Sequence, residues 1–303
     1  MKNWLRKIAV VLFGFGQMAN ASDIPNFAET EQDAKQGNAA SQFNLVYYLG
    51  KGAPKDYKQA EHWFRRAAEQ GDVDAQSNLG GLYYKGQGVA QDYEQAKYWF
   101  QKAAAQGFAK AQYDLGIIYF FGKGIEQDYD QAARWYEKAA EQGYLDAQYN
   151  LAIMYDNGFG VSKDRSKAVE WYRKAAEQGD NQAQYTLATR YMHGVGIQKD
   201  FKQAVQWLRR AADQENIKAQ LDLGVAYHNG FGVRQDEKQA LYWYRKAAEQ
   251  GSSEAQYNLG VMYHYGQGVP QNQSVAKEWF SKACHNGSQQ GCDAYQKLDQ
   301  TGY

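Results

Sequence analysis

The amino-acid sequence predicts an all-α protein, an α-solenoid of about seven helix-turn-helix repeats of 36 residues. Two observations carry this prediction: tryptophan recurs at a constant 36-residue interval, and a G-x-G pair recurs with it. The tryptophans are Trp63, Trp99, Trp135, Trp171, Trp207, Trp243 and Trp279. A repeated hairpin buries its apolar face only against its neighbours, so we expect one quasi-linear domain over residues 41–290.

The first helix of each unit is predicted from an apolar stripe. In the second unit Ala75, Leu79, Leu82 and Tyr83 follow the i, i+4, i+7, i+8 spacing of one helical face. The helix is expected to end at Gly86, and a second glycine follows two residues later. Glycine permits the positive φ that ends a helix and turns the chain, so each G-x-G pair predicts a turn.

The second helix is predicted to begin at an N-cap, whose side chain accepts a bond from an otherwise unpaired amide. The N-cap residues are Asp56, Asp92, Asp128, Asp164, Asp200, Asp236 and Asn272. The inner face of this helix in the second unit is Ala96, Trp99, Phe100, Ala103 and Ala104. These positions again have helical spacing, so we expect one buried indole per unit to fill the space between hairpins.

A terminating glycine is expected to close the second helix. It stands at Gly71, Gly107, Gly143, Gly179, Gly251 and Gly287. Glu215 replaces it after the fifth of these helices. Because a residue with a side chain disfavours positive φ, the turn there is predicted to be looser or differently shaped.

These patterns resemble a known repeat family. The residues AQYNLGVMYHYGQGV from Ala255, with the alanine-rich segment around Trp279, are similar to the Sel-one-like repeat, a relative of the tetratricopeptide repeat. The resemblance covers about residues 41–290 and implies a right-handed superhelix with the first helices on its concave side. It also implies a scaffold or adaptor role and leaves the partner open. Residues 22–40 are expected to form an N-terminal segment with a cap helix, and residues 291–303 a C-terminal cap helix and tail.

The first twenty-one residues are predicted to be a cleaved signal peptide. Met1–Lys7 form a basic region, Ile8–Phe15 an apolar one, and Ala19–Ala21 an A-x-A cleavage site before Ser22. A membrane anchor is the alternative, but this apolar run is far shorter than the roughly 20 residues that span a bilayer. We therefore expect a periplasmic or secreted protein without a membrane span.

Charge and motifs disfavour several other functions. The 34 basic and 34 acidic side chains balance, so nucleic acid is not an expected partner. The sequence has no Walker A, H-E-x-x-H or G-x-S-x-G motif, and we predict no catalytic residue, metal or cofactor. His193, His228 and His264 recur near the end of successive first helices. A surface role is favoured over metal binding, because neighbouring hairpins hold such side chains roughly 10 Å apart. The oligomeric state is left open.

The two cysteines are candidates for a disulfide. Cys284 ends the last second helix and Cys292 begins the helix that follows, and antiparallel neighbours can bring the two Cβ atoms together. The sequence also resembles a cysteine-rich subgroup of Sel-one-like bacterial proteins, in which cysteines with this spacing cross-link neighbouring helices. Free core cysteines are one alternative, and a nucleophile paired with His285 is another.

A second stripe on the first helix is the candidate partner-binding surface. It includes the third and tenth positions of the repeat: Tyr113, Phe120, Tyr149, Asp156, Tyr185, Met192, His228, Tyr257 and His264. The third position is usually aromatic and the tenth varies, so the tenth is predicted to set specificity for a peptide, with no packing role of its own. The alternative is that the tyrosines pack as core. Asn78, Asn150 and Asn258, at the fourth position, are expected to hold a peptide backbone.

Two classes of function follow. The first is an exported scaffold or adaptor that binds a protein or peptide through its concave surface. The second is a cell-wall or β-lactam hydrolase, because the cysteine-rich subgroup has been linked to that chemistry. Ser274 and Lys277 form a Ser-x-x-Lys sequence, but no S-D-N or K-T-G accompanies it. The scaffold is therefore favoured.

Overall fold

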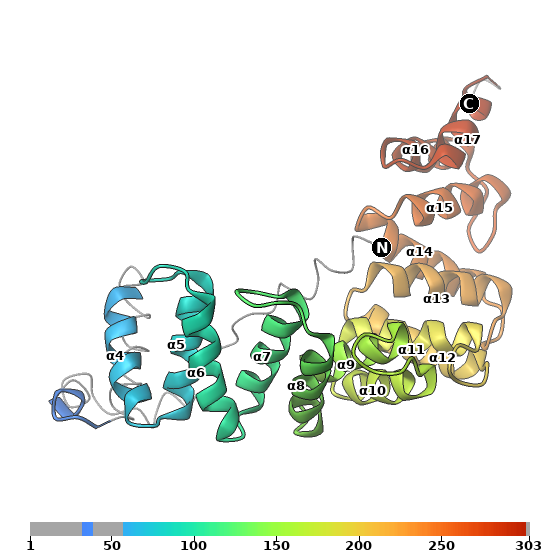
Figure 1. The fold of residues 1–303 in the computed structure, drawn as a ribbon. Helices are drawn as coiled ribbons and strands as arrows, with labels where there is room; N and C mark the ends of the chain where they lie inside the picture. The colour runs from blue at the N-terminus through green and yellow to red at the C-terminus, as the bar shows by residue number, and fades with distance from the viewer. Residues whose placement is uncertain (1–31, 39–56, 301–303) are drawn as a thin grey trace. The chain divides into compact units, whose positions relative to one another are not determined.

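The computed structural model describes residues 32–38 and 57–300, and in these ranges it contains helices and turns but no strand (Figure 1). The first helices of the repeats are α5 (Val73–Lys85), α7 (Ala109–Phe121), α9 (Leu145–Asn157), α11 (Asn181–His193), α13 (Ile217–Asn229) and α15 (Ser253–Tyr265). The second helices are α4 (Tyr57–Glu69), α6 (Tyr93–Ala105), α8 (Tyr129–Glu141), α10 (Arg165–Glu177), α12 (Phe201–Asp213), α14 (Glu237–Glu249) and α16 (Gln273–His285). Helix α17 (Gln289–Gln300) follows. The predicted all-α repeat fold is confirmed.

Some predicted features lie outside the described residues. They are the signal peptide, most of the segment 22–40, and the beginning of the first repeat including Asp56. The chain divides between Lys163 and Asp164 into two compact units, and each unit is a series of antiparallel hairpins. In the described ranges no helix is both long and apolar enough to cross a membrane.

The predicted turns and N-caps are present. Gly158 ends α9 in the left-handed conformation, with φ 79°. A Cβ atom on Gly160 would lie 2.0 Å from the carbonyl oxygen of Tyr129, so only glycine fits where this turn meets the preceding second helix. Side-chain caps are made by Asp92, Asp128, Asp164, Asp200, Asp236 and Asn272.

The expectation of a deeply buried tryptophan in every unit is wrong. Trp99, Trp207 and Trp243 are buried, whereas the other four repeat tryptophans are only half-buried. The following residue is buried in every unit: Phe64, Phe100, Tyr136, Tyr172, Leu208, Tyr244 and Phe280. In the four units with a half-buried tryptophan, the indole lies at the rim of the buried face, where a cation can cover it. The Lys174 Nζ atom, for example, lies 3.8 Å from the ring centroid of Trp171.

The turn at Glu215 is not differently shaped, contrary to the prediction. Glu215 has φ 64° and is the one non-glycine residue with positive φ in the described part of the chain. Its N–H donates to the Ala212 carbonyl at 3.0 Å, as the Gly179 N–H donates to the Ala176 carbonyl at 3.1 Å. The hydrogen bonds that close the second helix therefore impose the left-handed conformation on a glutamate.

A row of buried glutamines links neighbouring hairpins, and the sequence analysis missed it. Gln76 donates to the Ala68 carbonyl of the preceding repeat at 3.0 Å and accepts from Gln106, at the end of the second helix of its own hairpin, at 2.8 Å. The same contact joins Gln142 to Gln112, Gln214 to Gln184, and Gln250 to Gln220. The sequence contained a signal for these links in the Ala-Gln pair that opens the recurring unit. A polar residue that recurs beside a core alanine is expected to be buried, and a buried polar side chain needs a hydrogen-bond partner.

Candidate functional site

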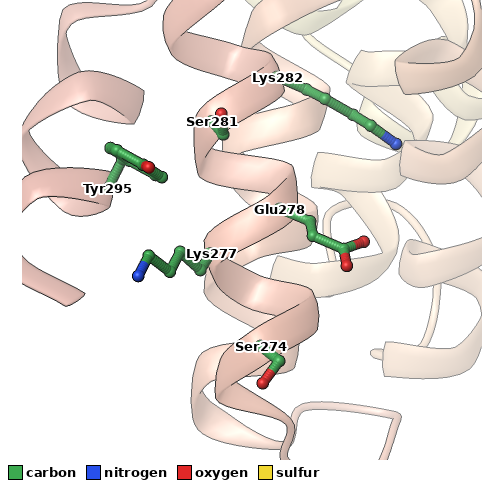
Figure 2. A pocket seen from close by; sticks show the side chains of 6 residues that line it. All are labelled: Ser274, Lys277, Glu278, Ser281, Lys282 and Tyr295. Carbon is green, nitrogen blue, oxygen red and sulfur yellow. The ribbon is translucent and has the colours of Figure 1, made fainter. Parts of the chain in front are cut away.

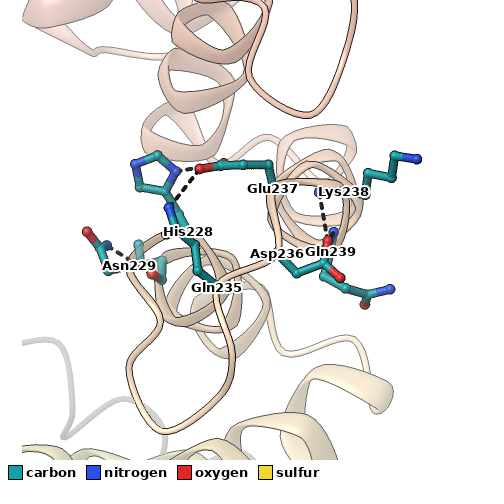
Figure 3. Close-up of polar contacts among 8 residues, drawn as sticks. His228, Asn229, Gln235, Asp236, Glu237, Lys238 and Gln239 are labelled. Carbon is teal, nitrogen blue, oxygen red and sulfur yellow. Dashed lines mark hydrogen bonds and ion pairs between the residues drawn. The ribbon is translucent and has the colours of Figure 1, made fainter.

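The tenth position of the first helix is paired with the first residue of the second helix in the same hairpin. Figure 3 shows one such pair, in which Nδ1 of His228 lies 2.9 Å from Oε2 of Glu237. In another hairpin the ring centroids of Phe120 and Tyr129 are 5.1 Å apart. His264 likewise contacts Gln273, at 2.5 Å. The prediction that this position has no packing role is therefore wrong.

Two residues of the predicted binding stripe belong to the core. Phe120 is 3% exposed and Tyr113 is 2% exposed. Tyr113 packs against the rings of Tyr136 and Tyr144, with centroids 5.6 and 5.1 Å away. The alternative that the tyrosines pack as core thus holds at this repeat. Neither Tyr113 nor Phe120 presents a surface to a partner.

The other predicted residues are half-buried on the first helices. Tyr149 and Asp156 lie on α9, in the unit that ends at Lys163. In the second unit the half-buried residues are Tyr185 and Met192 on α11, His228 on α13, and Tyr257 and His264 on α15. These side chains combine packing contacts with a share of exposed surface, which is the arrangement that amphipathic anchors need.

Tyr185 and Asp222 join neighbouring first helices of the second unit. The phenol of Tyr185 donates a hydrogen bond to the Asp222 carboxylate. Burial raises the pKa of Asp222, the hydrogen bond from Tyr185 opposes this rise, and the charge of Glu254 adds to it. Burial also raises the pKa of Tyr185, and the Asp222 charge raises it further. The phenol of Tyr185 is therefore neutral, and it is hydrogen-bonded to a carboxyl group that is partly shielded from water.

The fourth-position asparagines are not equivalent. Asn78 donates its side-chain N–H to the Asp74 carbonyl of its own helix at 2.9 Å, and Asn150 is buried. Asn258 is half-buried. The expected role in holding a peptide backbone stays a prediction for Asn78 and Asn258, which are both half-buried, whereas Asn150 is buried.

The two cysteines are joined. Cys284 on α16 and Cys292 on α17 form a disulfide with Cα atoms 4.4 Å apart. No free thiol remains for the alternative of a nucleophile, and the His285 Nδ1 atom contacts the Ser281 carbonyl at 2.8 Å. The bridge ties the last helix to the repeat before it.

A shallow pocket lies between α16 and α17 and contains the Ser-x-x-Lys residues. It is lined by Ser274, Lys277, Glu278, Ser281, Lys282 and Tyr295 (Figure 2). The Lys277 Nζ atom lies 2.7 Å from Asp299 Oδ1, and in Figure 2 the side chain extends away from Ser274. A lysine that activates a serine must lie close to the hydroxyl, whereas the amino group of Lys277 is paired with Asp299. In the described residues no three His, Cys, Asp or Glu side chains are grouped as metal ligands.

The antiparallel hairpins, their glycine turns and their glutamine links define a helical-repeat protein of the α-solenoid class. The Sel1 repeat model matches seven successive segments, 39–72, 73–108, 109–144, 145–180, 181–216, 217–252 and 253–288. The chain therefore belongs to the Sel1 repeat family. Proteins of this family are generally scaffolds for protein–protein interaction.

Two solved structures are similar over most of the chain. One is a protective antigen of uropathogenic Escherichia coli strains with an SLR fold, 34% identical, with a TM-score of 0.84 over 92% of this chain. This chain spans 65% of the length of that antigen. The other is a Sel1 repeat protein from Oxalobacter formigenes, 35% identical, with a TM-score of 0.69, covering 92% of this chain and 82% of its own. A comparison with curated protein sequences finds no match.

Proposed function

We propose that the protein is an exported scaffold that binds a protein or peptide partner on the surface of its first helices. The observation that carries the proposal is the set of half-buried side chains on α11, α13 and α15, above all Tyr185, Met192 and Tyr257. Tyrosine and methionine offer large contact areas, and tyrosine loses little conformational entropy on binding. Phe120 and Tyr113 are buried in packing contacts, so they do not belong to the proposed binding surface.

Export is supported by the signal-peptide pattern before Ser22 and by the Cys284–Cys292 disulfide. Disulfides persist in oxidising compartments such as the bacterial periplasm or the cell exterior. The similarity to a protective antigen of Escherichia coli points in the same direction. The mass of the protein isolated from the cell envelope or medium tests this part, and we expect a chain that begins at Ser22. A full-length cytoplasmic product would contradict export.

Site-specific photo-crosslinking tests the binding surface. A photoreactive phenylalanine analogue replaces Met192 on the first helix α11 in one variant and Gln206 on the second helix α12 in the control. Both positions lie in the same unit, and Gln206 is exposed. We expect a discrete adduct, identified by mass spectrometry, from the Met192 variant in cells.

Competition separates a specific adduct from a random collision. The unlabelled wild-type protein should suppress the Met192 adduct, because it competes for the same partner. An equal yield of the same adduct from the Gln206 variant would contradict the proposed surface. It would place the partner on the second helices instead.

A further inference from the structure

Two open hollows of the same kind lie at the G-x-G ends of hairpins three repeats apart. The α13–α14 hollow, in the second unit, has a volume of about 700 Å³. The α7–α8 hollow, in the first unit, has a volume of about 570 Å³. Tyr227 and Val233 in the former occupy the repeat positions of Tyr119 and Ile125 in the latter. The two hollows are therefore the same feature of the repeat with different side chains.

The α13–α14 hollow contains cations where the α7–α8 hollow contains acids. Arg234 and Lys238 line the former. Glu126 and Asp130 occupy the same repeat positions in the latter. Arg234 and Lys238 are both exposed. The α13–α14 hollow therefore offers room, access from outside and two cationic side chains to a ligand.

The acids of the α13–α14 hollow are already paired. Asp236 caps the first turn of α14, and Oε2 of Glu237 lies 2.9 Å from Nδ1 of His228. Figure 3 shows the Lys238 side chain extending away from the His228–Glu237 pair. Within the described ranges, neither Arg234 nor Lys238 forms an ion pair. The hollow thus presents positive charge with which an anion from outside can pair.

The lysines at this end of the hairpins stand where a helix disfavours them. Lys202 and Lys238 are the second residues of α12 and α14. Glu94 and Asp130 hold that position in α6 and α8 of the first unit. The partial positive charge at a helix N-terminus stabilises an acid there and opposes a cation. A local conflict of this kind is expected at functional positions, and a bound anion would relieve it.

An exposed aromatic ring lies beside these cations. Phe231 is 46% exposed and stacks on Phe201, the first residue of α12, with ring centroids 5.3 Å apart. A Cβ atom on the next residue, Gly232, would lie 2.8 Å from the backbone nitrogen of Lys202. The turn that contains Phe231 and Arg234 therefore lies against the N-terminal end of α12.

We propose that Lys202, Phe231, Arg234 and Lys238 form a docking surface, the basic edge, for an acidic segment of a protein partner. Carboxylates of the segment pair with the three cations, and an apolar side chain packs on Phe231. A peptide suits this surface better than an anionic bilayer, because side chains can enter a hollow and a flat lipid surface cannot. The inference goes beyond the proposed function, since the basic edge lies at the hairpin ends and not on the faces of the first helices.

Isothermal titration calorimetry of the full chain tests the basic edge with a defined probe, an acetylated octapeptide of six glutamates and two phenylalanines. We expect one peptide per chain, with an affinity that falls as the salt concentration rises. The double variant Arg234→Glu, Lys238→Asp gives this hollow the charges of the α7–α8 hollow and should weaken binding about tenfold or more. Its Tm should rise, because an acid is favoured at the second position of α14, so unfolding would not explain the loss.

Matched controls separate charge from the apolar contact. The double variant Glu126→Gln, Asp130→Asn alters the α7–α8 hollow instead and should leave binding unchanged. Phe231→Ala should weaken binding about fivefold and leave its salt dependence unchanged, because the ring carries no charge. A probe with glutamine in place of every glutamate should not bind.

The basic edge is overturned if the acidic peptide does not bind, or if it binds equally to the wild type and to the Arg234→Glu, Lys238→Asp variant. Equal binding of the glutamine peptide also overturns it. Binding to phosphatidylglycerol vesicles without binding to the acidic peptide would assign the surface to a membrane instead. Failed crosslinking at Met192 with intact peptide binding overturns the proposed first-helix surface alone, and the reverse overturns the basic edge alone.

Discussion

The imidazole of His228 and the carboxylate of Glu237 are partners across one hairpin, with Nδ1 and Oε2 2.9 Å apart. His228 lies in the last turn of α13, and Glu237 is the first residue of α14. In another hairpin Phe120 and Tyr129 occupy the same two positions and pack ring against ring. The two positions therefore change together from one repeat to another because they contact each other.

This relationship predicts a coupled pair of substitutions. His228→Phe alone should destabilise the protein by about 1 kcal/mol, because the ring would face the Glu237 carboxylate without a hydrogen bond. Adding Glu237→Tyr should restore most of the loss by recreating the Phe120–Tyr129 pair. Urea unfolding followed by circular dichroism measures the three variants. Strictly additive effects would contradict the pairing.

Tyr136 should matter more to stability than its neighbour Trp135. Tyr136 is fully buried, so Tyr136→Ala is expected to cost about 3–5 kcal/mol, as truncation of a core aromatic does. Trp135 is half-buried with Lys138 over its ring, and Trp135→Ala should cost clearly less. Chemical unfolding of the two variants side by side decides the order. A larger loss of stability for Trp135→Ala than for Tyr136→Ala would show that the tryptophan is the main core residue after all.

Glu215→Gly should stabilise the protein by about 1 kcal/mol, because glycine adopts positive φ without the steric cost that glutamate bears. The matched control is Gly179→Glu, which places glutamate in the equivalent turn, where φ is 98°. This control should lose a similar amount. Differential scanning calorimetry gives both shifts in Tm. If Glu215→Gly left the Tm unchanged, glutamate would adopt positive φ in this turn at no cost in stability.

Removing the disulfide should loosen the C-terminal end. Replacing Cys284 and Cys292 together by serine opens a bridge whose ends are 8 residues apart, worth about 2–3 kcal/mol in the chain-entropy model. In this double variant, amide hydrogens should exchange faster in α17 than in α13. Thiol labelling of the denatured, unreduced wild type is the control and should find no free thiol. Two labelled thiols would show that the bridge is absent from the protein in solution.

Asp222→Asn should stabilise the protein increasingly as the pH rises. Burial raises the folded-state pKa of Asp222 above its unfolded value, so the folded state binds this proton more tightly. The contribution of the protonated carboxyl is fully present below the ordinary Asp pKa of about 3.9 and is lost as pH rises through the folded pKa. Asparagine keeps an acceptor for Tyr185 and does not titrate. Its advantage in Tm should therefore grow between about pH 3 and pH 7, and a constant difference would refute the raised pKa.

The sequence alone determined the parts of the fold that depend on local contacts. The helix end at Gly158 and the N-cap at Asp128 each follow from residues within one repeat, and Cys284 meets Cys292 across one short turn. Helix periodicity, capping and glycine conformation act over this short range. The same pattern recurs throughout the array, so each copy supports the assignment of the others.

Only the tertiary structure decided which side chains are buried in packing contacts and are therefore unavailable to a partner. Adjacent residues on a helix point about 100° apart, so a small rotation of the packed helices places Tyr136 inside and Trp135 at the rim. Periodicity does not specify that rotation. It likewise does not show that Phe120 packs against Tyr129 across its hairpin. These outcomes depend on contacts between helices, and such contacts are set by the shapes of both partners at once.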